Sequence, residues 1–254
     1  EGYRIIHGDS CLCIWKACDK DEEKTGSLYM LDCTEDEYNN VWSVYLDMEE
    51  NYCSIREKID GNMDSFLYEA AMHEKGIRIL KQDPWEALIS FIISQNRNIP
   101  AIKASIEKLC ERAGVRKIDS RGEVYYTFPT PEAVAGMTED ALNECKLGYR
   151  DKYVRRAAEA VCSGEIDLDW IGVGTDDEVF DNLTGLYGVG KKVASCMLLF
   201  GLHHLDAFPV DVWIKRVLSE HYGFRGNDRD TAAFAYSLFG DNAGIAQQYI
   251  FYAA

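Results

Sequence analysis

The sequence lacks long apolar runs and paired cysteine motifs. No stretch approaches the roughly 20 consecutive apolar residues of a membrane-spanning helix, so we expect no membrane partner. Nine cysteines occur, but none forms a CxxC pair and no four have zinc or iron–sulfur spacing. We therefore expect reduced, buried thiols in a cytosolic protein, and neither a disulfide scaffold nor a cysteine metal site.

Basic residues are scarce as well. The 43 acidic residues outnumber the 27 lysines and arginines, which gives a formal net charge of −16. Because attraction to phosphate needs a basic surface, this balance alone disfavours a general nucleic-acid binder. The charge is uneven, however: residues 1–80 hold 18 acids and 8 bases, whereas 146–156 holds five bases and one acid. Any contact with nucleic acid should therefore be local, with weak and salt-sensitive nonspecific affinity.

The pattern of apolar residues and turns predicts strands at the N-terminus and helices after them. Apolar and aromatic residues dominate 3–7, 10–17 and 27–33, and the turn at Gly8-Asp9 and the charged loop 19–26 between them suit antiparallel hairpins. Thr34 and Glu37 then form a capping-box pattern, which helical periodicity follows. The chain begins without methionine and directly with strand-like sequence, so we expect residues upstream of Glu1.

The remaining chain predicts a long run of short helices. They are expected at 52–59, 63–74, 84–95, 99–113, 131–135, 138–146, 150–163, 176–185, 190–201, 209–221 and 230–239. The expected fold class is α+β and predominantly α, with a small antiparallel N-terminal sheet followed by two helical subdomains. We divide the chain into an N-terminal sheet module with helices (1–80), a helical subdomain (81–185) and a C-terminal helical subdomain (186–254).

Residues 186–194, L-Y-G-V-G-K-K-V-A, are the most informative part of the chain. Gly188 and Gly190 end one expected helix and begin the next, and the first can adopt a φ angle that a side chain would forbid. Amides at the start of the second helix can donate to a phosphate oxygen, and Lys191 and Lys192 add positive charge there. Seen alone, G-V-G is more typical of an ordinary packing loop between helices.

A second motif, P-V-D, follows 19 residues after Lys192 and begins another expected helix. Pro209 suits the first helical position, and Asp211 would lie in the first turn, where the helix dipole favours a carboxylate. An acid at a helix start is common by itself. Together, the two motifs place an amine and a carboxylate where they can face one site.

This pair of motifs resembles the helix–hairpin–helix DNA glycosylases, most closely their 8-oxoguanine DNA glycosylase branch. The family's hairpin reads approximately L-P-G-V-G-x-K-V-A and is followed by P-V-D; here Tyr187 replaces the proline. The resemblance implies a bifunctional DNA glycosylase/AP lyase that excises 8-oxoguanine from duplex DNA in base excision repair, through a lysine Schiff base and β-elimination. It implies Lys192 as the nucleophile and Asp211 as the catalytic carboxylate.

The resemblance covers roughly residues 77–254 and implies further DNA contacts. Asn96 would fill the space left by an extruded base, Tyr149 would wedge into the base stack, and Arg150 would read the unpaired cytosine. The other DNA-binding residues implied, or expected from their charge, are Arg97, Gly188, Gly190 and Lys191. Taken singly, these residues are also typical of turns, half-buried aromatics and surface ion pairs.

A lesion pocket and a cation site are also implied. Gln247 would hydrogen-bond the edge of the damaged base, and Phe251 and Cys196 would lie against its two faces. No cofactor is required, although the backbone carbonyls of Thr184, Leu186 and Val189 would hold a structural monovalent cation, as in relatives. We expect a monomer that binds damaged double-stranded DNA and lies in the cytoplasm with the chromosome of a prokaryote.

The sequence departs from the family pattern at two positions. Ala101 stands where the second cytosine-reading arginine is expected, and Trp213 stands where some members have a phosphate-contacting histidine. Two alternative functions remain open: a glycosylase for another damaged base, and a non-catalytic helix–hairpin–helix DNA-binding module. The hairpin Lys192 favours the lyase branch, and its coexistence with Asp211 counts against the binding module.

Overall fold

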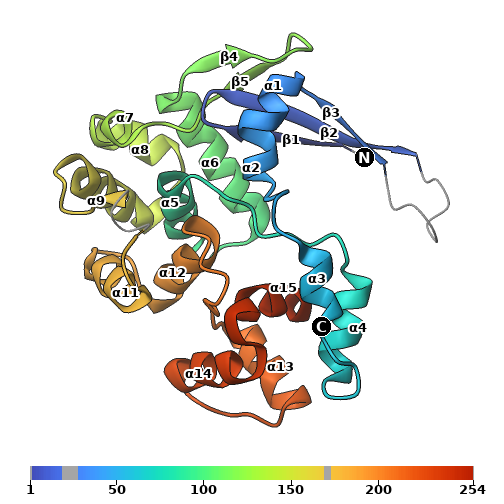
Figure 1. Cartoon of the computed structure of the whole chain (residues 1–254). Coiled ribbons are helices and arrows are strands. Elements are labelled where there is room, and N and C mark those ends of the chain that lie inside the picture. The colour runs from blue at the N-terminus through green and yellow to red at the C-terminus, as the bar shows by residue number, and fades with distance from the viewer. Residues whose placement is uncertain (1, 19–27, 169–172, 254) are drawn as a thin grey trace. The chain divides into compact units, whose positions relative to one another are not determined.

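The computed structural model describes residues 2–18, 28–168 and 173–253, and most of them are helical (Figure 1). The expected charged loop 19–26 lies outside the described residues. Two compact units make up the chain: Glu1–Val44 with Ile93–Ser163, and Tyr45–Ile92 with Gly164–Ala254, called unit 1 and unit 2 below. This division differs from the three consecutive segments expected from the sequence, because each unit combines two stretches that are distant along the chain.

The three expected strands of unit 1 are confirmed. β1 (Gly2–His7), β2 (Ser10–Cys18) and β3 (Leu28–Asp32) form an antiparallel sheet in the order β1-β2-β3. Gly8 turns the chain between the first two strands with a φ of +53°, a conformation that glycine adopts without strain. Side chains alternate between the two faces of the sheet, and Leu12 is fully buried.

A short helical segment follows the sheet, as the capping-box pattern predicted. It consists of α1 (Glu35–Glu37), the π-helix η1 (Tyr38–Trp42) and α2 (Ser43–Tyr45). The Glu37 amide donates to the Thr34 hydroxyl oxygen at 3.2 Å, and the Thr34 amide donates to the Glu37 carboxylate at 2.8 Å. Trp42 is fully buried, so this segment contributes to the hydrophobic core of unit 1.

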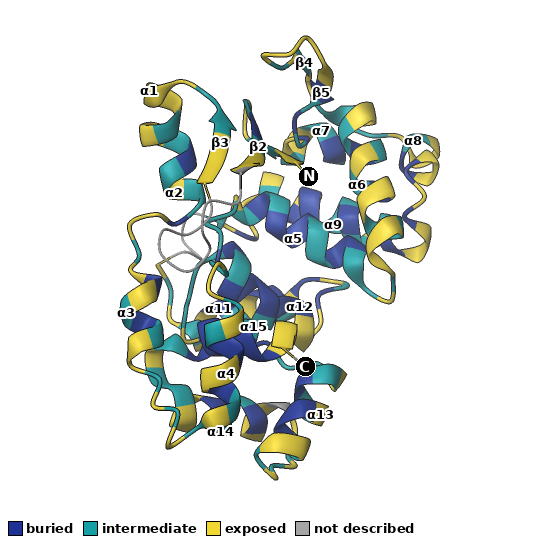
Figure 2. Ribbon diagram, turned by 90° about the vertical axis from the view of Figure 1, so that its right-hand side faces the viewer, coloured by how far each residue is buried: buried dark blue, intermediate teal, exposed yellow. Residues whose placement is uncertain are grey.

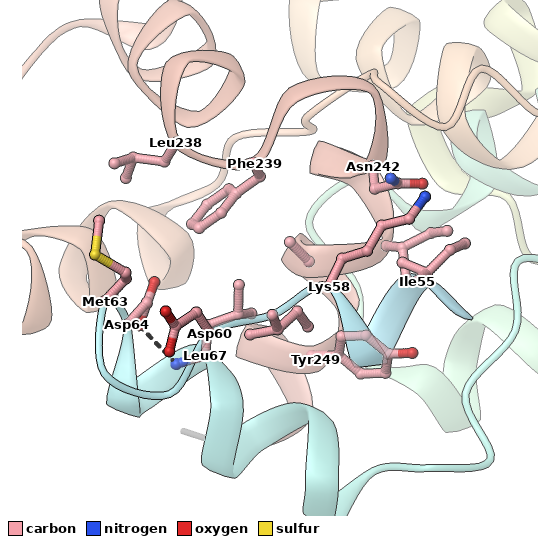
Figure 3. A pocket seen from close by; sticks show the side chains of 13 residues that line it. Ile55, Lys58, Asp60, Met63, Asp64, Leu67, Leu238, Phe239, Asn242 and Tyr249 are labelled. Atoms are coloured by element: carbon pink, nitrogen blue, oxygen red, sulfur yellow. Dashed lines mark hydrogen bonds between the residues drawn. The ribbon is translucent and has the colours of Figure 1, made fainter. Parts of the chain in front are cut away.

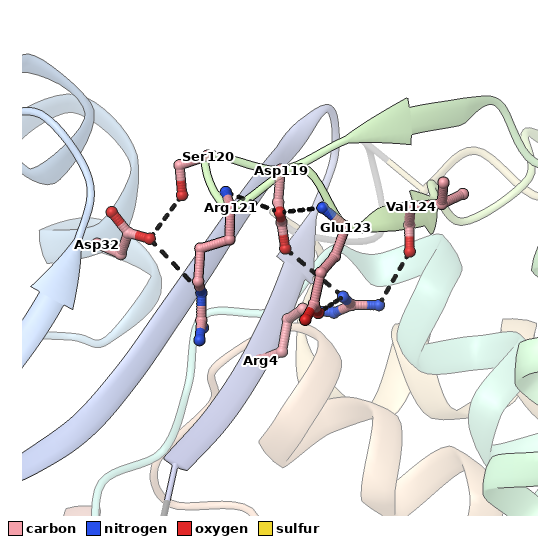
Figure 4. A network of polar contacts seen from close by, with 7 residues as sticks. All are labelled: Arg4, Asp32, Asp119, Ser120, Arg121, Glu123 and Val124. Atoms are coloured by element: carbon pink, nitrogen blue, oxygen red, sulfur yellow. Dashed lines mark hydrogen bonds and ion pairs between the residues drawn. The ribbon is translucent and has the colours of Figure 1, made fainter.

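One hairpin of unit 1 was not expected from the sequence. β4 (Arg116–Ile118) and β5 (Val124–Tyr126) are only three residues each and pair antiparallel. Arg4 of β1 donates to the Glu123 carboxylate at 3.1 Å and to the Val124 carbonyl at 3.3 Å (Figure 4). The hairpin is therefore held by contacts to the N-terminal sheet that are distant in sequence, which no local pattern could indicate.

The helices of unit 1 agree closely with the expected ranges. They are α6 (Ile99–Ala113), α7 (Pro131–Ala135), α8 (Glu139–Glu144), the 3-10 helix η2 (Gly148–Arg150) and α9 (Asp151–Cys162). Side chains of Asn98, Thr130 and Thr138 cap α6, α7 and α8 by accepting from backbone amides. Helix α5 (Pro84–Ser94) carries the chain from unit 2 into unit 1.

Unit 2 is entirely helical in the residues described. It contains α3 (Tyr52–Glu57), α4 (Ser65–His73), most of α5, α11 (Asp176–Gly185), α12 (Lys191–Cys196), the π-helix η3 (Met197–Gly201), α13 (Val212–His221), α14 (Asp228–Phe239), the 3-10 helix η4 (Gly240–Asn242) and α15 (Ala243–Ala253). No helix of the described chain is both long enough and apolar enough to cross a membrane.

Helix α15 is largely buried (Figure 2), and it packs against α4. On another side, Gly244 allows α15 to approach η3 and the loop before α13, because a Cβ atom there would lie 2.4 Å from the Leu199 side chain and 2.7 Å from the Ala207 carbonyl oxygen. The Gly244 amide also donates to the Leu205 carbonyl at 2.8 Å. The loop that precedes α13 is thereby fixed against α15.

A buried carboxylate connects three segments of unit 2. Asp47, 1% exposed, accepts a hydrogen bond from the Tyr52 hydroxyl at 2.8 Å and pairs with Lys81 Nζ at 2.9 Å. Its third partner is His203, whose Nε2 lies 3.1 Å away. The backbone carbonyl of Asp47 accepts from Arg78 at 2.7 Å. Burial alone would raise the pKa of Asp47, but Lys81, Tyr52 and His203 together lower it.

Replacing Asp47 by asparagine should lower the free energy of unfolding by about 1.5–3 kcal/mol, the usual contribution of hydrogen bonds to a charged group. Because the pKa of Asp47 is lowered in the folded protein, this contribution is present above about pH 4 and is lost as the pH falls through the folded value. Urea unfolding of wild type and Asp47→Asn should therefore differ at neutral pH and converge in acid.

The matched control is Asp206→Asn, which removes an exposed carboxylate from the same unit. Equal stability of Asp47→Asn and Asp206→Asn at neutral pH would contradict a stabilising role for the buried carboxylate.

Candidate functional site

The predicted hairpin joins α11 to α12 in unit 2. The Val189 amide donates to the Leu186 carbonyl at 3.0 Å, and both of these side chains are buried. Gly188 has a φ of +90°, as expected for the first glycine of the motif. Gly190 occupies the N-cap of α12 and has no side chain to cap the helix, so the amides of the first turn are left for an external acceptor.

Lys192 and Asp211 meet at the end of this hairpin. Lys192 Nζ lies 3.9 Å from Asp211 Oδ2, with the lysine side chain 66% exposed and the aspartate side chain 27% exposed. The two motifs therefore do place an amine and a carboxylate at one site. Because the lysine is open to solvent, a ligand that covers it would exclude water from both groups.

Asp211 differs in one respect from the sequence prediction. Helix α13 begins at Val212, so Asp211 is its N-cap and Pro209 lies outside the helix, two residues earlier. The backbone of Asp211 is extended, and its Oδ1 accepts from the Ile214 amide at 2.8 Å. This cap satisfies a helix amide that would otherwise lack a partner, which explains why the helix starts later than expected. It also leaves Oδ2 directed toward Lys192.

Cys196 lies one helical turn after Lys192, on the same face of α12. The cysteine is 8% exposed. Burial raises the pKa of its thiol to about 11, although Lys192 lowers it and Asp211 raises it. The group is consequently a neutral thiol at physiological pH, suited to van der Waals contact and not to nucleophilic attack.

Gln247 of α15 is buried close to the same loop. Its Nε2 approaches the Pro209 carbonyl oxygen at 3.5 Å, and its Oε1 accepts a hydrogen bond from the Gln248 side chain. Phe251 lies one turn further along α15 and is 41% exposed. The structure therefore gathers Lys192, Asp211, Cys196 and Gln247, with Phe251 on the face of α15 that carries Gln247.

Two of the hollows in unit 2 border the hairpin or α15, and neither is lined by Gln247 or Phe251. The larger, about 660 Å³, borders Lys191 and Lys192 and is otherwise formed by α11, α14 and residues 206–210. The smaller, about 310 Å³, is formed by α3, α4, α14 and α15 (Figure 3). The predicted lesion pocket is thus not a preformed cavity in either place.

Three of the predicted DNA contacts form a separate cluster in unit 1. Asn96 has a positive φ of +50°, a conformation that asparagine tolerates better than most residues. Its side-chain amide donates to the Tyr149 hydroxyl at 3.2 Å, and both residues are exposed. Tyr149 also makes an edge contact with the Tyr153 ring, with 5.7 Å between centroids. The exposed Asn96 belongs to the loop between α5 and α6, and the exposed Tyr149 belongs to η2.

Arg150 is placed differently from what its predicted role requires. It is 5% exposed, and its guanidinium donates to the backbone carbonyls of Gln95, Leu147 and Asn96. The guanidinium carbon lies 4.3 Å from the Tyr149 ring centroid. In this conformation Arg150 holds the Asn96 loop, and contact with a cytosine would require its guanidinium to leave these carbonyls.

Arg97 likewise contacts the protein itself. It donates to the Ser105 hydroxyl and to the Lys146 carbonyl, both at 2.8 Å. Lys146 has a φ of +56°, so Arg97 stabilises a loop conformation that a lysine seldom adopts. In the basic strip 146–156, Arg155 also donates to backbone carbonyls, while Lys146 and Lys152 are exposed. The sequence could not indicate these internal roles, because the positions of the arginines along the chain do not show which carbonyl or hydroxyl oxygens lie near them in the fold.

The hairpin carbonyls give the predicted monovalent cation a chemically suitable set of oxygens. The Leu186 carbonyl accepts from Val189 and keeps a second lone pair, while the Thr184 hydroxyl donates to the Phe180 carbonyl at 2.9 Å. Carbonyl oxygens in a tight turn are appropriate ligands for a hard cation. The cation at Thr184, Leu186 and Val189 stays a prediction.

Two family models match the chain. The model described as HhH-GPD superfamily base excision DNA repair protein matches residues 89–238. The model described as 8-oxoguanine DNA glycosylase, N-terminal domain, matches residues 3–88. Together the two models extend over nearly all of the described residues and include Lys192, Cys196 and Asp211 as well as the cluster of Asn96, Tyr149 and Arg150, whereas Gln247 and Phe251 lie beyond them.

Individual proteins are similar over most of their length. A probable N-glycosylase/DNA lyase of Methanothermobacter thermautotrophicus is 31% identical over 83% of this chain and 72% of that protein. The structure of MBOgg1 in complex with a low-affinity DNA ligand is 36% identical, covers 99% of this chain and 84% of that chain, and has a TM-score of 0.89. The Clostridium acetobutylicum 8-oxoguanine glycosylase/lyase, in complex with double-stranded DNA containing cytosine opposite 8-oxoguanine, is 34% identical, with 99% and 83% coverage and a TM-score of 0.88.

The cap at Asp211 can be tested apart from any chemistry. Asp211→Ala removes the acceptor for the Ile214 amide and should lower the free energy of unfolding by about 1 kcal/mol. Asp211→Asn keeps an acceptor of equal capping strength and should leave the stability within about 0.5 kcal/mol of wild type. Thermal unfolding followed by circular dichroism compares the three proteins; equal losses in both variants would show that the charge, and not the cap, stabilises α13.

Proposed function

The chain belongs to the HhH-GPD superfamily of base excision DNA repair proteins, and on that premise we infer that it is a bifunctional DNA glycosylase/AP lyase that excises 8-oxoguanine from duplex DNA. The observation that carries this function is the Lys192 amine 3.9 Å from the Asp211 carboxylate, at the end of a helix–hairpin–helix motif. Relatives named N-glycosylase/DNA lyase and 8-oxoguanine glycosylase/lyase support the same reaction class.

We assign the bond-forming step to Lys192. The sugar carbon that must be attacked is inaccessible while the base is stacked, so the damaged nucleotide has to leave the duplex first. The neutral amine then attacks C1′, the bond between C1′ and the base breaks, and the base leaves after taking up a proton. Loss of the amine proton and opening of the sugar ring give a Schiff base between Lys192 and the deoxyribose.

Asp211 is assigned the electrostatic role. Its Oδ2 is held toward the lysine by the cap at Oδ1, so a negative charge is already positioned where cationic character develops on the sugar. The same oxygen can receive the proton that the amine loses. Removal of a C2′ proton from the Schiff base then expels the 3′ phosphate, which cleaves the strand on the 3′ side of the lesion.

Recognition of the flipped base is assigned to Gln247, Cys196 and Phe251. The 3.5 Å contact from Gln247 to the Pro209 carbonyl is long for a hydrogen bond, so a base edge can replace it at small cost. Cys196 supplies a neutral, polarisable thiol and Phe251 an exposed ring for the two faces of the base. The contacts form only when the base arrives, which agrees with the absence of these residues from the two hollows.

We assign the duplex side of the reaction to the exposed pair in unit 1. Tyr149 is the wedge and Asn96 the residue that fills the vacated space; together they offset an unstacking cost of a few kcal/mol. Arg150 is a positioning residue in the free protein, because it fixes the backbone of the Asn96 loop. With DNA as the partner, we place the protein in the cytoplasm with the chromosome.

Borohydride reduction in the presence of duplex containing 8-oxoguanine should trap one covalent protein–DNA complex, because it reduces the Schiff base to a stable amine. Lys192→Gln should trap none, while Lys191→Gln, which removes a neighbouring DNA-binding lysine but keeps the attacking amine, should still trap the complex. Asp211→Asn, which keeps the helix cap, should trap more slowly. Denaturing gel electrophoresis measures the complex.

Wild type that binds this duplex but traps nothing would contradict the lyase assignment and favour the non-catalytic DNA-binding module. Trapping with a different damaged base and none with 8-oxoguanine would favour the other alternative, a glycosylase for that base.

Preference for the base opposite the lesion should be weak, because Ala101 has no donor to read cytosine. Excision rates opposite C, T, G and A should therefore lie closer together in wild type than in Ala101→Arg. A bidentate arginine contact is worth about 1–3 kcal/mol of discrimination. Ala104→Arg, which adds the same charge at an exposed position of α6, is the control. A sharp preference for cytosine in wild type would show that another residue reads this base.

A further inference from the structure

Two cysteines share one face of the N-terminal sheet. Cys11 and Cys13 are two residues apart in β2, so their side chains point to the same side. Their partners across the strand pair are Ile6 and Arg4 of β1. The loop between β4 and β5 carries Asp119 to this face, where Arg4 Nη1 lies 3.6 Å from Asp119 Oδ2 (Figure 4). All of these residues belong to unit 1.

The three side chains converge closely. One ligand atom each from Cys11, Cys13 and Asp119 lies within 4.8 Å of the other two. In the part of the chain that the structure describes, this is the one group of three or more histidine, cysteine, aspartate or glutamate residues with metal-binding separation. Cys13 is 2% exposed and the Asp119 side chain is 2% exposed, so the cluster lies inside the protein.

The Asp119 carboxylate is oriented by its own loop. Its Oδ1 accepts from the Arg121 amide at 3.0 Å and from the Glu123 amide at 2.8 Å. Its Oδ2 is buried and makes no hydrogen bond, because Arg4 Nη1 at 3.6 Å forms only a long ion pair with it. A buried carboxylate oxygen without a donor is costly, and in native proteins it normally has a partner, which includes bound ions. This second observation is independent of the two thiols and points into the same space.

We propose that Cys11, Cys13 and Asp119 bind one thiophilic divalent cation, and we take zinc as its representative. Two thiolates and one carboxylate form a borderline-soft ligand set that favours zinc over magnesium or calcium. Ligand atoms about 2.0–2.3 Å from a tetrahedral zinc ion lie roughly 3.5–3.8 Å apart, so the observed cluster, whose atoms lie within 4.8 Å of one another, needs a closure of about 1 Å. The two thiol protons pass to solvent on binding, and one water completes the tetrahedron.

The surrounding charges are compatible with a cation. Two thiolates, a carboxylate and a divalent ion carry one net negative charge, which the guanidinium groups of Arg4 and Arg121 offset. Arg4 does not depend on Asp119 alone, because it also donates to the Glu123 carboxylate and the Val124 carbonyl. The bound ion would connect β2 to the β4–β5 hairpin, two parts of unit 1 that are more than a hundred residues apart.

The test uses the full chain, reduced and freed of metal by a chelator. Titration with zinc against a chromophoric chelator should show one tight site, and zinc should raise the melting temperature. Cobalt should give the charge-transfer absorption that is specific to thiolate ligands. Cys13→Ser should lose the tight site and the absorption, and Asp119→Asn should weaken zinc binding while it keeps the absorption. Cys11→Ser, at the less buried cysteine, replaces Cys13→Ser if the latter does not fold.

The controls are Cys33→Ser, at a half-buried cysteine of the same unit, and Cys162→Ser, at an exposed one; both should bind zinc as wild type does. The proposal is overturned if the reduced wild type takes up no zinc, if its cobalt complex lacks the thiolate band, or if a variant at Cys11 or Cys13 binds as tightly as wild type. Borohydride trapping does not depend on these residues, so its result separates a failure here from a failure of the glycosylase assignment.

Discussion

The geometry of the site depends on one carboxylate that uses its two oxygens differently. Asp211 Oδ1 accepts from the first turn of α13, and this fixes the side chain so that Oδ2 meets Lys192. A cap is strongly directional, because the acceptor must lie over the amide of a helix that already exists. The lysine is fixed from the other side, since the turn at Gly188 sets where α12 begins. The Lys192–Asp211 pair is therefore positioned by the starts of two helices and not by contacts between the two side chains, which agrees with their 3.9 Å separation.

The loop that carries Asp211 is held along its whole length. At its beginning, His203 contacts the buried Asp47; further on, Leu205 accepts from Gly244; and Pro209 lies against Gln247. The anchors belong to the segment around Asp47 and to α15, so the position of the proposed catalytic carboxylate follows from the packing of unit 2. Such anchoring keeps the amine and the carboxylate in a fixed geometry while the bound DNA is deformed. The same contacts consequently stabilise unit 2 and position Asp211 for the proposed reaction at Lys192.

The sequence predicted the features that depend on neighbouring residues, and it did not predict those that depend on contacts between distant parts of the chain. The strands, the capping box of Thr34 and Glu37 and the positive φ of Gly188 each depend on a few neighbouring residues, and all were predictable. The hairpin β4–β5 depends on Arg4 and the N-terminal sheet, more than a hundred residues away. Arg150 was interpreted as a DNA contact from the family resemblance and Arg97 from its charge, but both donate to backbone carbonyls that no motif specifies. The cluster of Cys11, Cys13 and Asp119 was missed for the same reason, since its third member comes from a distant loop.

The use of arginine inside unit 1 also bears on how an acidic chain can recognise DNA. Of the bases in the 146–156 strip, Arg150 and Arg155 are committed to carbonyls, while Lys146 and Lys152 are exposed; in unit 2 the hairpin adds Lys191 and Lys192. Each phosphate contact adds about 0.9 to the slope with which the logarithm of the affinity falls against the logarithm of the salt concentration. This small number of cations therefore gives only modest attraction to ordinary duplex DNA. Affinity must then come from contacts that form only when a base leaves the stack: the Tyr149 wedge, the Asn96 side chain and the residues around the flipped base. A net charge of −16 thus favours selection of a deformable, damaged site over retention on intact DNA.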